Sequence, residues 1–236
     1  MKEINMKLTV MSTLAVKVAL EAQILPEFAK KHGVTPDVSW NPTTVLMTRI
    51  ENQEKADAVI LIDKPMAKLV EQGNVIASSV QKVARAGIGI AVKNGTISPD
   101  ISTPDAFKTA MLAARSVAYS RGGASGIYFA EAIKKLGIAD EVNAKATIIP
   151  EGFTAEQIMN GNADIAIQQI SELMTVDGVT IVGPLPEAIQ LWTDFSAGIF
   201  TDAKQPENAQ KFIDHLTSEY AHNAYMAGGL TSRLDF

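Results

Sequence analysis

The amino-acid sequence predicts an α/β protein in which mixed, mostly parallel sheets are flanked by helices. Short apolar runs rich in Val and Ile recur along the chain, separated by segments with helical periodicity. Strands that alternate with helices tend to pair in parallel, and parallel strands covered on both faces are apolar almost throughout. Helix punctuation agrees, because Thr103 before Pro104 and Gln205 before Pro206 fit helix starts, and Gly137 fits a helix end.

The apolar runs predict strands, in chain order, at residues 8–11, 38–40, 58–62, 86–92, 116–119, 146–149, 165–168 and 179–182. Apolar residues spaced i, i+3, i+4 and i+7 predict helices at residues 14–31, 44–53, 125–136, 155–160 and 206–218. No linker rich in Pro, Gly or Ser interrupts this order, so any two lobes must be joined by ordinary strands. We expect crossings near residues 83–85 and 201–203.

Composition limits the possible functions. The chain has 236 residues, of which 47% are apolar, enough for one large domain or two small lobes. A net charge of −5 without a basic cluster argues against a nucleic-acid partner. No apolar run approaches the roughly 20 residues of a membrane-spanning helix, so no membrane insertion is expected. The absence of cysteine excludes disulfides, thiolate metal sites and cysteine nucleophiles.

The start of the chain leaves the compartment open. Residues 1–6 are mostly polar and run directly into an expected strand, so no signal peptide is predicted in this sequence. The protein is therefore expected to be periplasmic if a signal peptide was removed and a start Met added, and cytoplasmic otherwise.

Two junctions between a strand and a helix in the first third of the chain carry hydroxyl groups. Ser12 and Thr13 precede the first long helix, and Thr43 follows Asn41 and Pro42 at the start of another. Helix N-termini beyond the carboxyl ends of strands present unpaired N–H groups that bind anions. Ordinary N-capping explains the same residues equally well.

Two later junctions are also unusual. Residues 119–126 form a glycine-rich segment with Arg121, whose guanidinium can donate two parallel hydrogen bonds. Residues 150–154 and the glutamines Gln168 and Gln169 form the other junction. Flexible-loop and surface positions are the alternatives for these residues. Together the junctions predict a local anion site with no carboxylate cluster to repel the ligand.

Catalytic and metal-binding patterns are weak. The sequence contains no H-E-x-x-H, paired-aspartate or nucleophile-elbow pattern, so neither a metal nor a cofactor is expected. His215 and His222 are predicted to lie on the surface. Asp57 and Asp164, each just before an expected strand, are interpreted as structural residues.

Several segments resemble the molybdate-binding periplasmic proteins of ABC transporters, a branch of the type II periplasmic binding proteins. They are L-T-V before a long helix, T-T-V-L-M-T-R-I followed by A-D-A-V-I-L, G-A-S-G-I-Y-F-A-E-A-I-K-K-L-G, and G-N-A-D-I-A-I-Q-Q. The resemblance covers nearly the whole chain. It implies two discontinuous lobes, residues 1–83 with 203–236 and residues 84–202, and a ligand in the cleft between them.

The resemblance also implies ligand-binding positions. Thr43 matches a ligand-binding serine, Ser125 a ligand position at a helix N-terminus, and Phe153 a backbone contact. The family's first serine matches Thr13 or, with a small shift, Ala15. Gln169 stands where the family has a ligating tyrosine. Arg121 is an addition, and it favours a carboxylate over a compact tetrahedral oxyanion. The full predicted lining is Ser12, Thr13, Ala15, Thr43, Arg121, Ser125, Gly126, Phe153 and Gln169.

We therefore expect a monomeric solute-binding protein that captures a small anion, an organic carboxylate or a molybdate-like oxyanion, with an ABC permease as partner. Some relatives resemble aconitate isomerases, so a tricarboxylate isomerase stays open as an alternative. That reaction needs a base, and the candidates near the junctions are Glu151, Lys17 and Glu172. A cytoplasmic anion-sensing module is a third possibility.

Overall fold

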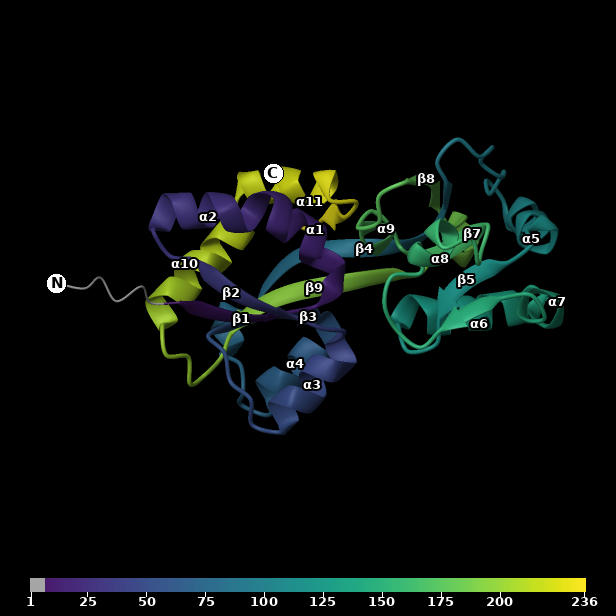
Figure 1. Ribbon diagram of the computed structural model, residues 1–236. Coiled ribbons are helices and arrows are strands. Elements are labelled where there is room, and N and C mark those ends of the chain that lie inside the picture. The colour runs from purple at the N-terminus through teal and green to yellow at the C-terminus, as the bar shows by residue number, and fades with distance from the viewer. Residues whose placement is uncertain (1–6) are drawn as a thin grey trace. The chain divides into compact units, whose positions relative to one another are not determined.

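The computed structural model describes residues 7–236, which form two compact units. The first contains the described residues up to Arg85 together with Thr193–Phe236, and the second is Ala86–Trp192. Two long strands, β4 (Gln81–Lys93) and β9 (Trp192–Ile199), carry the chain across the two boundaries (Figure 1). The sequence-based expectation about a signal peptide concerns residues 1–6, which lie outside the described part of the chain.

The second crossing differs from the sequence prediction. It lies between Trp192 and Thr193 rather than near residues 201–203. The reason is that β9 pairs antiparallel with β3 (Ala58–Ile62) from Phe195 to Ile199, which assigns residues 193–202 to the first unit. The run W-T-D-F-S-A-G-I mixes polar and small residues, and it becomes a regular strand by pairing with strands that are distant in the sequence, β3 among them.

The first unit has a sheet in the order β2-β1-β3-β9, and β10 (Thr231–Ser232) pairs with β4. β1 (Leu8–Ser12) lies parallel to both β2 (Pro36–Trp40) and β3. The helical segments of this unit are η1 (Leu14–Val16), α1 (Lys17–Ala19), η2 (Leu20–Ile24), α2 (Leu25–His32), α3 (Thr43–Glu51), α4 (Asp63–Glu71), η3 (Ala77–Ser79), α10 (Pro206–Leu216) and α11 (Glu219–Ala227). α3 and α4 lie on one side of the sheet, and α2 and α10 lie on the other (Figure 1).

The predicted helix at residues 14–31 is present as one continuous helical stretch with changing geometry. It begins as a 3-10 turn at η1, becomes α-helical, widens to a π-helix at Leu20–Ile24 and returns to α-helix in α2. The wide turn comes just before Pro26, which has no N–H to donate to the preceding turn. The stretch ends at Gly33, whose φ of +68° is a left-handed conformation that glycine adopts without strain.

The second unit has the strand order β4-β7-β5-β6, and β8 (Val179–Pro184) pairs with β4. β5 (Val117–Ser120) lies parallel to both β6 (Thr147–Ile149) and β7 (Ile165–Gln169). Its helical segments are α5 (Pro104–Ala113), α6 (Ala124–Lys135), α7 (Ala139–Asn143), α8 (Glu156–Met159), α9 (Ile170–Leu173) and η4 (Glu187–Ile189). The sheets are mixed, because β4 and β9 are antiparallel to β7 and β3, respectively.

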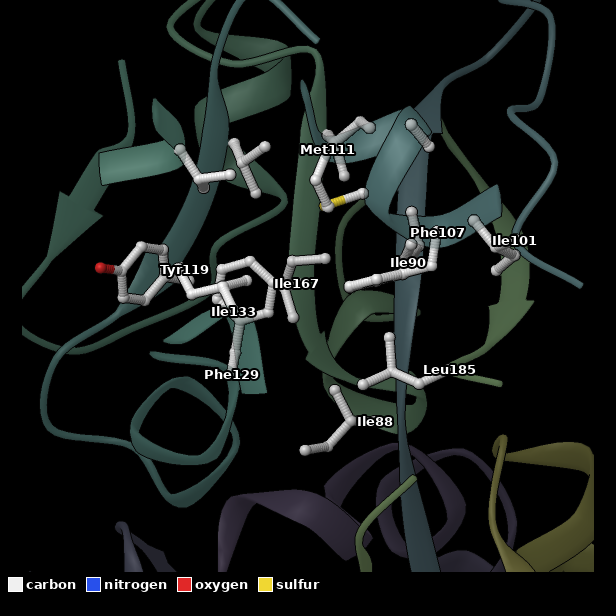
Figure 2. Packing of buried hydrophobic residues seen from close by; sticks show 14 of the residues in the cluster. Ile88, Ile90, Ile101, Phe107, Met111, Tyr119, Phe129, Ile133, Ile167 and Leu185 are labelled. Carbon is white, nitrogen blue, oxygen red and sulfur yellow. The ribbon is translucent and has the colours of Figure 1, made fainter. Parts of the chain in front are cut away.

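The core of the second unit lies between its sheet and its helices. Phe107 from α5, Phe129 from α6, and Tyr119 and Ile167 from the strands are each at most 5% exposed (Figure 2). The rings of Tyr119 and Phe129 meet edge to face at 5.0 Å. This packing fixes the start of α6 against the carboxyl end of β5, where several candidate residues lie.

The predicted helix punctuation is confirmed. The Thr103 hydroxyl accepts a hydrogen bond from the Ala106 N–H at 3.1 Å, and Pro206 is the first residue of α10. Gly137 follows α6 with a φ of +69°. α4 and α11 are not among the helices that the sequence predicted. α4 opens with the charged pair Asp63 and Lys64 immediately after a strand, which hides its start in the sequence.

Candidate functional site

Three hydroxyl side chains gather at the carboxyl end of the parallel strands in the first unit. Ser12 ends β1, Thr13 follows it and Thr43 begins α3, and their exposed fractions are 0%, 6% and 7%. The two junctions are hydrogen-bonded, because the Asn41 N–H donates to the Ser12 carbonyl at 3.2 Å. We call Ser12, Thr13 and Thr43 the hydroxyl cluster.

Thr43 is the most informative member of this cluster. Its Oγ1 is buried and has no hydrogen-bond partner among residues 7–236. A buried hydroxyl without a partner costs about 1–3 kcal/mol of folding free energy, so such groups are rare without a functional reason. Thr43 is also the first residue of α3, a helix with no acidic residue in its first turn. A ligand oxygen that accepted a hydrogen bond from this hydroxyl would also lie at the positive end of the helix dipole.

The turn before Thr43 is held by Arg49. Its guanidinium donates to the Ser39 hydroxyl at 2.6 Å and also to the Asn41 side-chain carbonyl, and it pairs with Glu54. This pairing raises the pKa of Arg49 and lowers the pKa of Glu54. The cation is therefore used to fix the β2–α3 turn.

The structure distinguishes the two positions proposed for the family's first serine. Thr13 is the residue before η1, and its side chain makes no capping hydrogen bond. Ala15 is 2% exposed and lies inside η1, so it can offer a ligand only its backbone N–H. Only Thr13 can supply a hydroxyl there, and Ser12 supplies a second one whose Oγ lies 3.2 Å from the Thr13 carbonyl.

Loops of the second unit form another group of candidates at the carboxyl ends of β5, β6 and β7. The Arg121 N–H donates to the Ile149 carbonyl at 2.8 Å, and the Gly122 N–H donates to the Pro150 carbonyl at 2.9 Å. These bonds place the loop after β5 beside the loop after β6. Ser125, 4% exposed, is the second residue of α6, whose first turn also lacks acidic residues.

The glycines of this segment have a packing role. A Cβ on Gly126 would lie 1.8 Å from the Ser120 carbonyl oxygen, and one on Gly123 would lie 2.7 Å from the Ser120 hydroxyl. A glycine-rich loop can let backbone approach a ligand closely. At Gly126 the close approach is instead between α6 and the end of β5.

Arg121 lies on the surface of the second unit. Its side chain makes no hydrogen bond or ion pair with another residue of the described chain. Its charge acts on Tyr119, where it offsets part of the rise in pKa that burial causes. An exposed guanidinium without a protein partner is available to a ligand carboxylate.

The two glutamines at the end of β7 have different roles. The Gln168 carbonyl accepts from the Thr154 N–H at 2.8 Å, and its amide donates to the Gly152 carbonyl at 3.0 Å, so this side chain anchors the loop after β6. Gln169 is 5% exposed, yet its side chain has no hydrogen-bond partner in the part of the chain that the structure describes. Phe153 lies in the anchored loop, half-buried.

The three candidate bases have unequal environments. Glu151 is exposed. The Lys17 Nζ lies 3.9 Å from the Glu21 Oε2, one helical turn further along the chain. Glu172 is partly buried in α9, and burial raises its pKa to about 7 despite hydrogen bonding from the Gln169 N–H and the Gln168 side chain. Next to it, the buried Ser171 hydroxyl has no partner within residues 7–236. Sequence reasoning did not single out Ser171, whose only signal is its place two residues after Gln169.

The remaining sequence interpretations have mixed outcomes. The prediction that His215 lies on the surface is wrong, because it is 4% exposed on the apolar face of α10, against Phe28, with burial lowering its pKa. The structural role of Asp57 is confirmed, since its carboxylate accepts from the Thr9 N–H at 2.8 Å and the Gln205 N–H at 2.9 Å. Asp164 likewise accepts from the Arg115 N–H at 3.0 Å.

Residues 7–236 contain neither a group of metal-ligating side chains nor a membrane-spanning helix. No three or more His, Cys, Asp or Glu side chains are grouped so that they could hold a metal ion. None of the helices described is both long and apolar enough to cross a bilayer.

A family match over most of the chain identifies the class of protein as solute-binding. Residues 8–231 match the family of bacterial extracellular solute-binding proteins, and the chain belongs to this family. An aconitate isomerase from a Pseudomonas species is 32% identical over 214 residues, which are 88% of this chain and 81% of that protein.

Solved structures share the fold at lower identity. The periplasmic molybdate-binding protein of Azotobacter vinelandii superimposes with a TM-score of 0.77 and 19% identity, covering 95% of this chain and 98% of that one. PEB3, bound to L-phospholactate, gives a TM-score of 0.69 and 16% identity over 95% of this chain and 99% of that one. The predicted family and its two-lobed α/β fold are thereby confirmed.

Proposed function

We propose that the protein is a receptor for a small organic anion that carries carboxylate groups, and that the hydroxyl cluster of the first unit binds one of these groups. The observation that carries the proposal is the Thr43 hydroxyl, buried without a partner at the N-terminus of α3. A ligand oxygen at this position would accept a hydrogen bond from the Thr43 hydroxyl. It would also accept hydrogen bonds from the free backbone N–H groups of the first helical turn.

The second unit supports a carboxylate rather than a compact oxyanion. Arg121 offers an exposed guanidinium, and Gln169 offers an amide with no partner in the described chain. A planar carboxylate can accept two of the guanidinium N–H groups, and an amide suits a hydroxyl, carbonyl or carboxylate oxygen. The fold itself does not choose, since one structural relative binds molybdate and another holds phospholactate.

Family membership supports a transport role in which the bound anion is delivered to an ABC permease from the periplasm. In this role the protein would act as a monomer. Sedimentation velocity with and without ligand would test the oligomeric state, and a stable dimer in both conditions would contradict it.

Calorimetric titration tests the choice of ligand. The purified protein is titrated with molybdate, tungstate, sulfate, citrate, cis-aconitate and trans-aconitate under one buffer condition. We expect a carboxylate to bind most tightly. Nanomolar binding of molybdate with no heat from any carboxylate would contradict the proposal.

A second function is favoured by one specific observation. The aconitate isomerase relative is 32% identical along 88% of this chain, whereas the solved structures cited above are below 20% identical. We therefore propose isomerisation of an aconitate-like tricarboxylate as the alternative to simple binding. NMR of either aconitate isomer with catalytic amounts of the protein would reveal the other isomer if this function is present.

A further inference from the structure

The carboxyl end of β7 and the short helix α9 hold three polar side chains in a mostly buried position. Gln169 is 5% exposed and Ser171 is 1% exposed, and neither side chain has a hydrogen-bond partner in the described residues. Glu172 follows them and is partly buried. We call Gln169, Ser171 and Glu172 the β7–α9 cluster. Buried polar groups that lack protein partners are uncommon unless a ligand or a reaction uses them.

The carboxyl group of Glu172 is partly buried, whereas the other acidic residues of the second unit are exposed. It has no ion pair with a lysine or arginine of residues 7–236. Burial raises its pKa to about 7, and the Gln169 N–H and the Gln168 side chain offset part of this rise by hydrogen bonding. A carboxyl group of this kind holds and releases a proton near neutral pH.

The neighbours of Glu172 place it beside candidate ligand-binding groups. Gln168 contacts Glu172 and also anchors the Gly152–Thr154 segment, which contains Phe153. Gln169 belongs to the predicted ligand lining and is the residue that precedes α9. Glu172 therefore belongs to the same group of loops as the candidate ligand-binding residues of the second unit.

We propose that Glu172 is the acid–base residue of an aconitate isomerase activity, moving one proton between two carbon atoms of the ligand. The proposal rests on the alternative function given above. The ligand's methylene group lies between a carboxylate and a carbon–carbon double bond. Glu172 takes a proton from this carbon, and the C–H electron pair forms a new double bond to the central carbon.

The original double-bond pair moves to the far carbon, where the adjacent carboxylate delocalises it. The proton on Glu172 is then delivered to that carbon, which returns Glu172 to its starting state. The double bond has moved along the skeleton, and the geometry about the new double bond decides which isomer is released. Substrate and product have the same atoms and oxidation level, so no oxidant, reductant or cofactor takes part. Arg121 and the N–H groups at the start of α6 would stabilise the charge that spreads onto the carboxylates.

A structural role for Glu172 makes a different prediction. The residue is the third of α9 and accepts a hydrogen bond from the N–H of the preceding Gln169, as in a capping box. Glu172→Gln retains a carbonyl oxygen that can accept this hydrogen bond but removes the acid–base group. A purely structural residue would thus tolerate Glu172→Gln without loss of proton transfer.

The test follows cis- and trans-aconitate by proton NMR in D₂O with the wild-type protein, Glu172→Gln, Glu172→Asp and the exposed control Glu187→Gln. We expect the wild type and Glu187→Gln to interconvert the isomers and incorporate deuterium at the methylene carbon. Glu172→Gln should slow both processes by at least about a hundredfold, in the range typical for general acid–base groups. Its calorimetric affinity for aconitate should stay within about threefold, and Glu172→Asp should recover part of the rate. The wild-type rate should rise with pH and level off above the pKa of Glu172.

Two outcomes would overturn the proposal in distinguishable ways. If the wild type converts the isomers and folded Glu172→Gln does so equally fast, the activity stands and the assignment of Glu172 fails. If the wild type binds aconitate but neither converts it nor exchanges its protons, the isomerase function itself fails. Should Glu172→Gln not fold, Glu172→Asp and the pH profile decide, since unchanged values in both would contradict the proposal.

Discussion

The Gln168 side-chain carbonyl accepts hydrogen bonds from both the backbone N–H and the hydroxyl of Thr154, at 2.8 and 3.1 Å. Thr154 is fully buried and Gln168 is 5% exposed, so these bonds join β7 to the loop after β6 away from water. A strand residue that looks misplaced in an apolar run is thus a clamp on the loop that carries Phe153.

Gln168→Leu should lower the free energy of unfolding by about 1–3 kcal/mol, because it leaves the Thr154 N–H and the Gly152 carbonyl without partners. Urea unfolding measures the loss. Gln210→Leu, at an exposed position on α10, is the control and should change stability by less than about 0.5 kcal/mol. Equal stability of the two variants would mean that the clamp is not maintained in solution.

Gly126→Ala should destabilise the second unit by about 3 kcal/mol or more, because its Cβ would lie 1.8 Å from a backbone oxygen of Ser120 that cannot rotate away. Gly123→Ala is the matched comparison. Its Cβ would meet the Ser120 side-chain hydroxyl at 2.7 Å, and that group can change rotamer. The melting temperature of Gly126→Ala should therefore be well below that of Gly123→Ala. The reverse order would contradict the packing described for α6.

Arg121→Ala should weaken binding of the preferred carboxylate by tenfold or more while leaving the melting temperature of the free protein unchanged. A hydrogen bond to a charged group contributes about 1.5–3 kcal/mol, and the exposed side chain makes no contact on which the fold depends. Arg115→Ala removes another exposed arginine of the same unit, one that is paired with Asp164. If both variants bind the ligand as tightly as the wild type, Arg121 has no part in recognition.

The stability of the protein should depend on pH through Glu172. Burial raises the pKa of this carboxyl group from 4.5 to about 7, so the folded state holds the proton more tightly than the unfolded chain. Its contribution to the free energy of unfolding is therefore fully present below pH 4.5 and is lost as the pH rises to about 7. Urea unfolding at intervals from pH 4.5 to 8 should show the wild type losing stability relative to Glu172→Gln over this range. The difference in free energy of unfolding between wild type and Glu187→Gln should stay nearly constant with pH. If the difference between wild type and Glu172→Gln is also independent of pH, the Glu172 carboxyl group is solvated in the folded protein.

The sequence predicted the fold well where its signals are local. Apolar runs identify β1, β3 and β5, and capping residues such as Thr103 mark helix ends without reference to the rest of the chain. The sequence failed at β9, which becomes a strand by pairing with strands distant in the chain such as β3, and at His215, which packs against Phe28 far away in the chain.

The candidate site was predicted by residue type but not by role. Hydroxyls at the ends of β1 and β2 could be identified from the sequence, yet only the structure distinguishes the unpartnered Thr43 from an ordinary helix cap. The neighbouring glutamines are chemically identical, and their different roles depend on which one reaches Thr154. Burial of Glu172 likewise arises from tertiary packing, which no spacing rule contains.

The measurement that tests the central claim most directly compares Thr43→Val with Thr44→Val. Thr43 is 7% exposed and its hydroxyl has no partner in the described chain, whereas the neighbouring Thr44 is exposed on the same helix. Valine keeps the shape of threonine and removes only the hydroxyl, so calorimetry and urea unfolding on both variants separate binding from stability. We predict that Thr43→Val binds the preferred carboxylate at least about tenfold more weakly while its free energy of unfolding stays equal to or above that of the wild type. Thr44→Val should match the wild type in both measurements. Unchanged affinity in Thr43→Val would contradict the proposal that this hydroxyl is held without a protein partner in order to bind an anion.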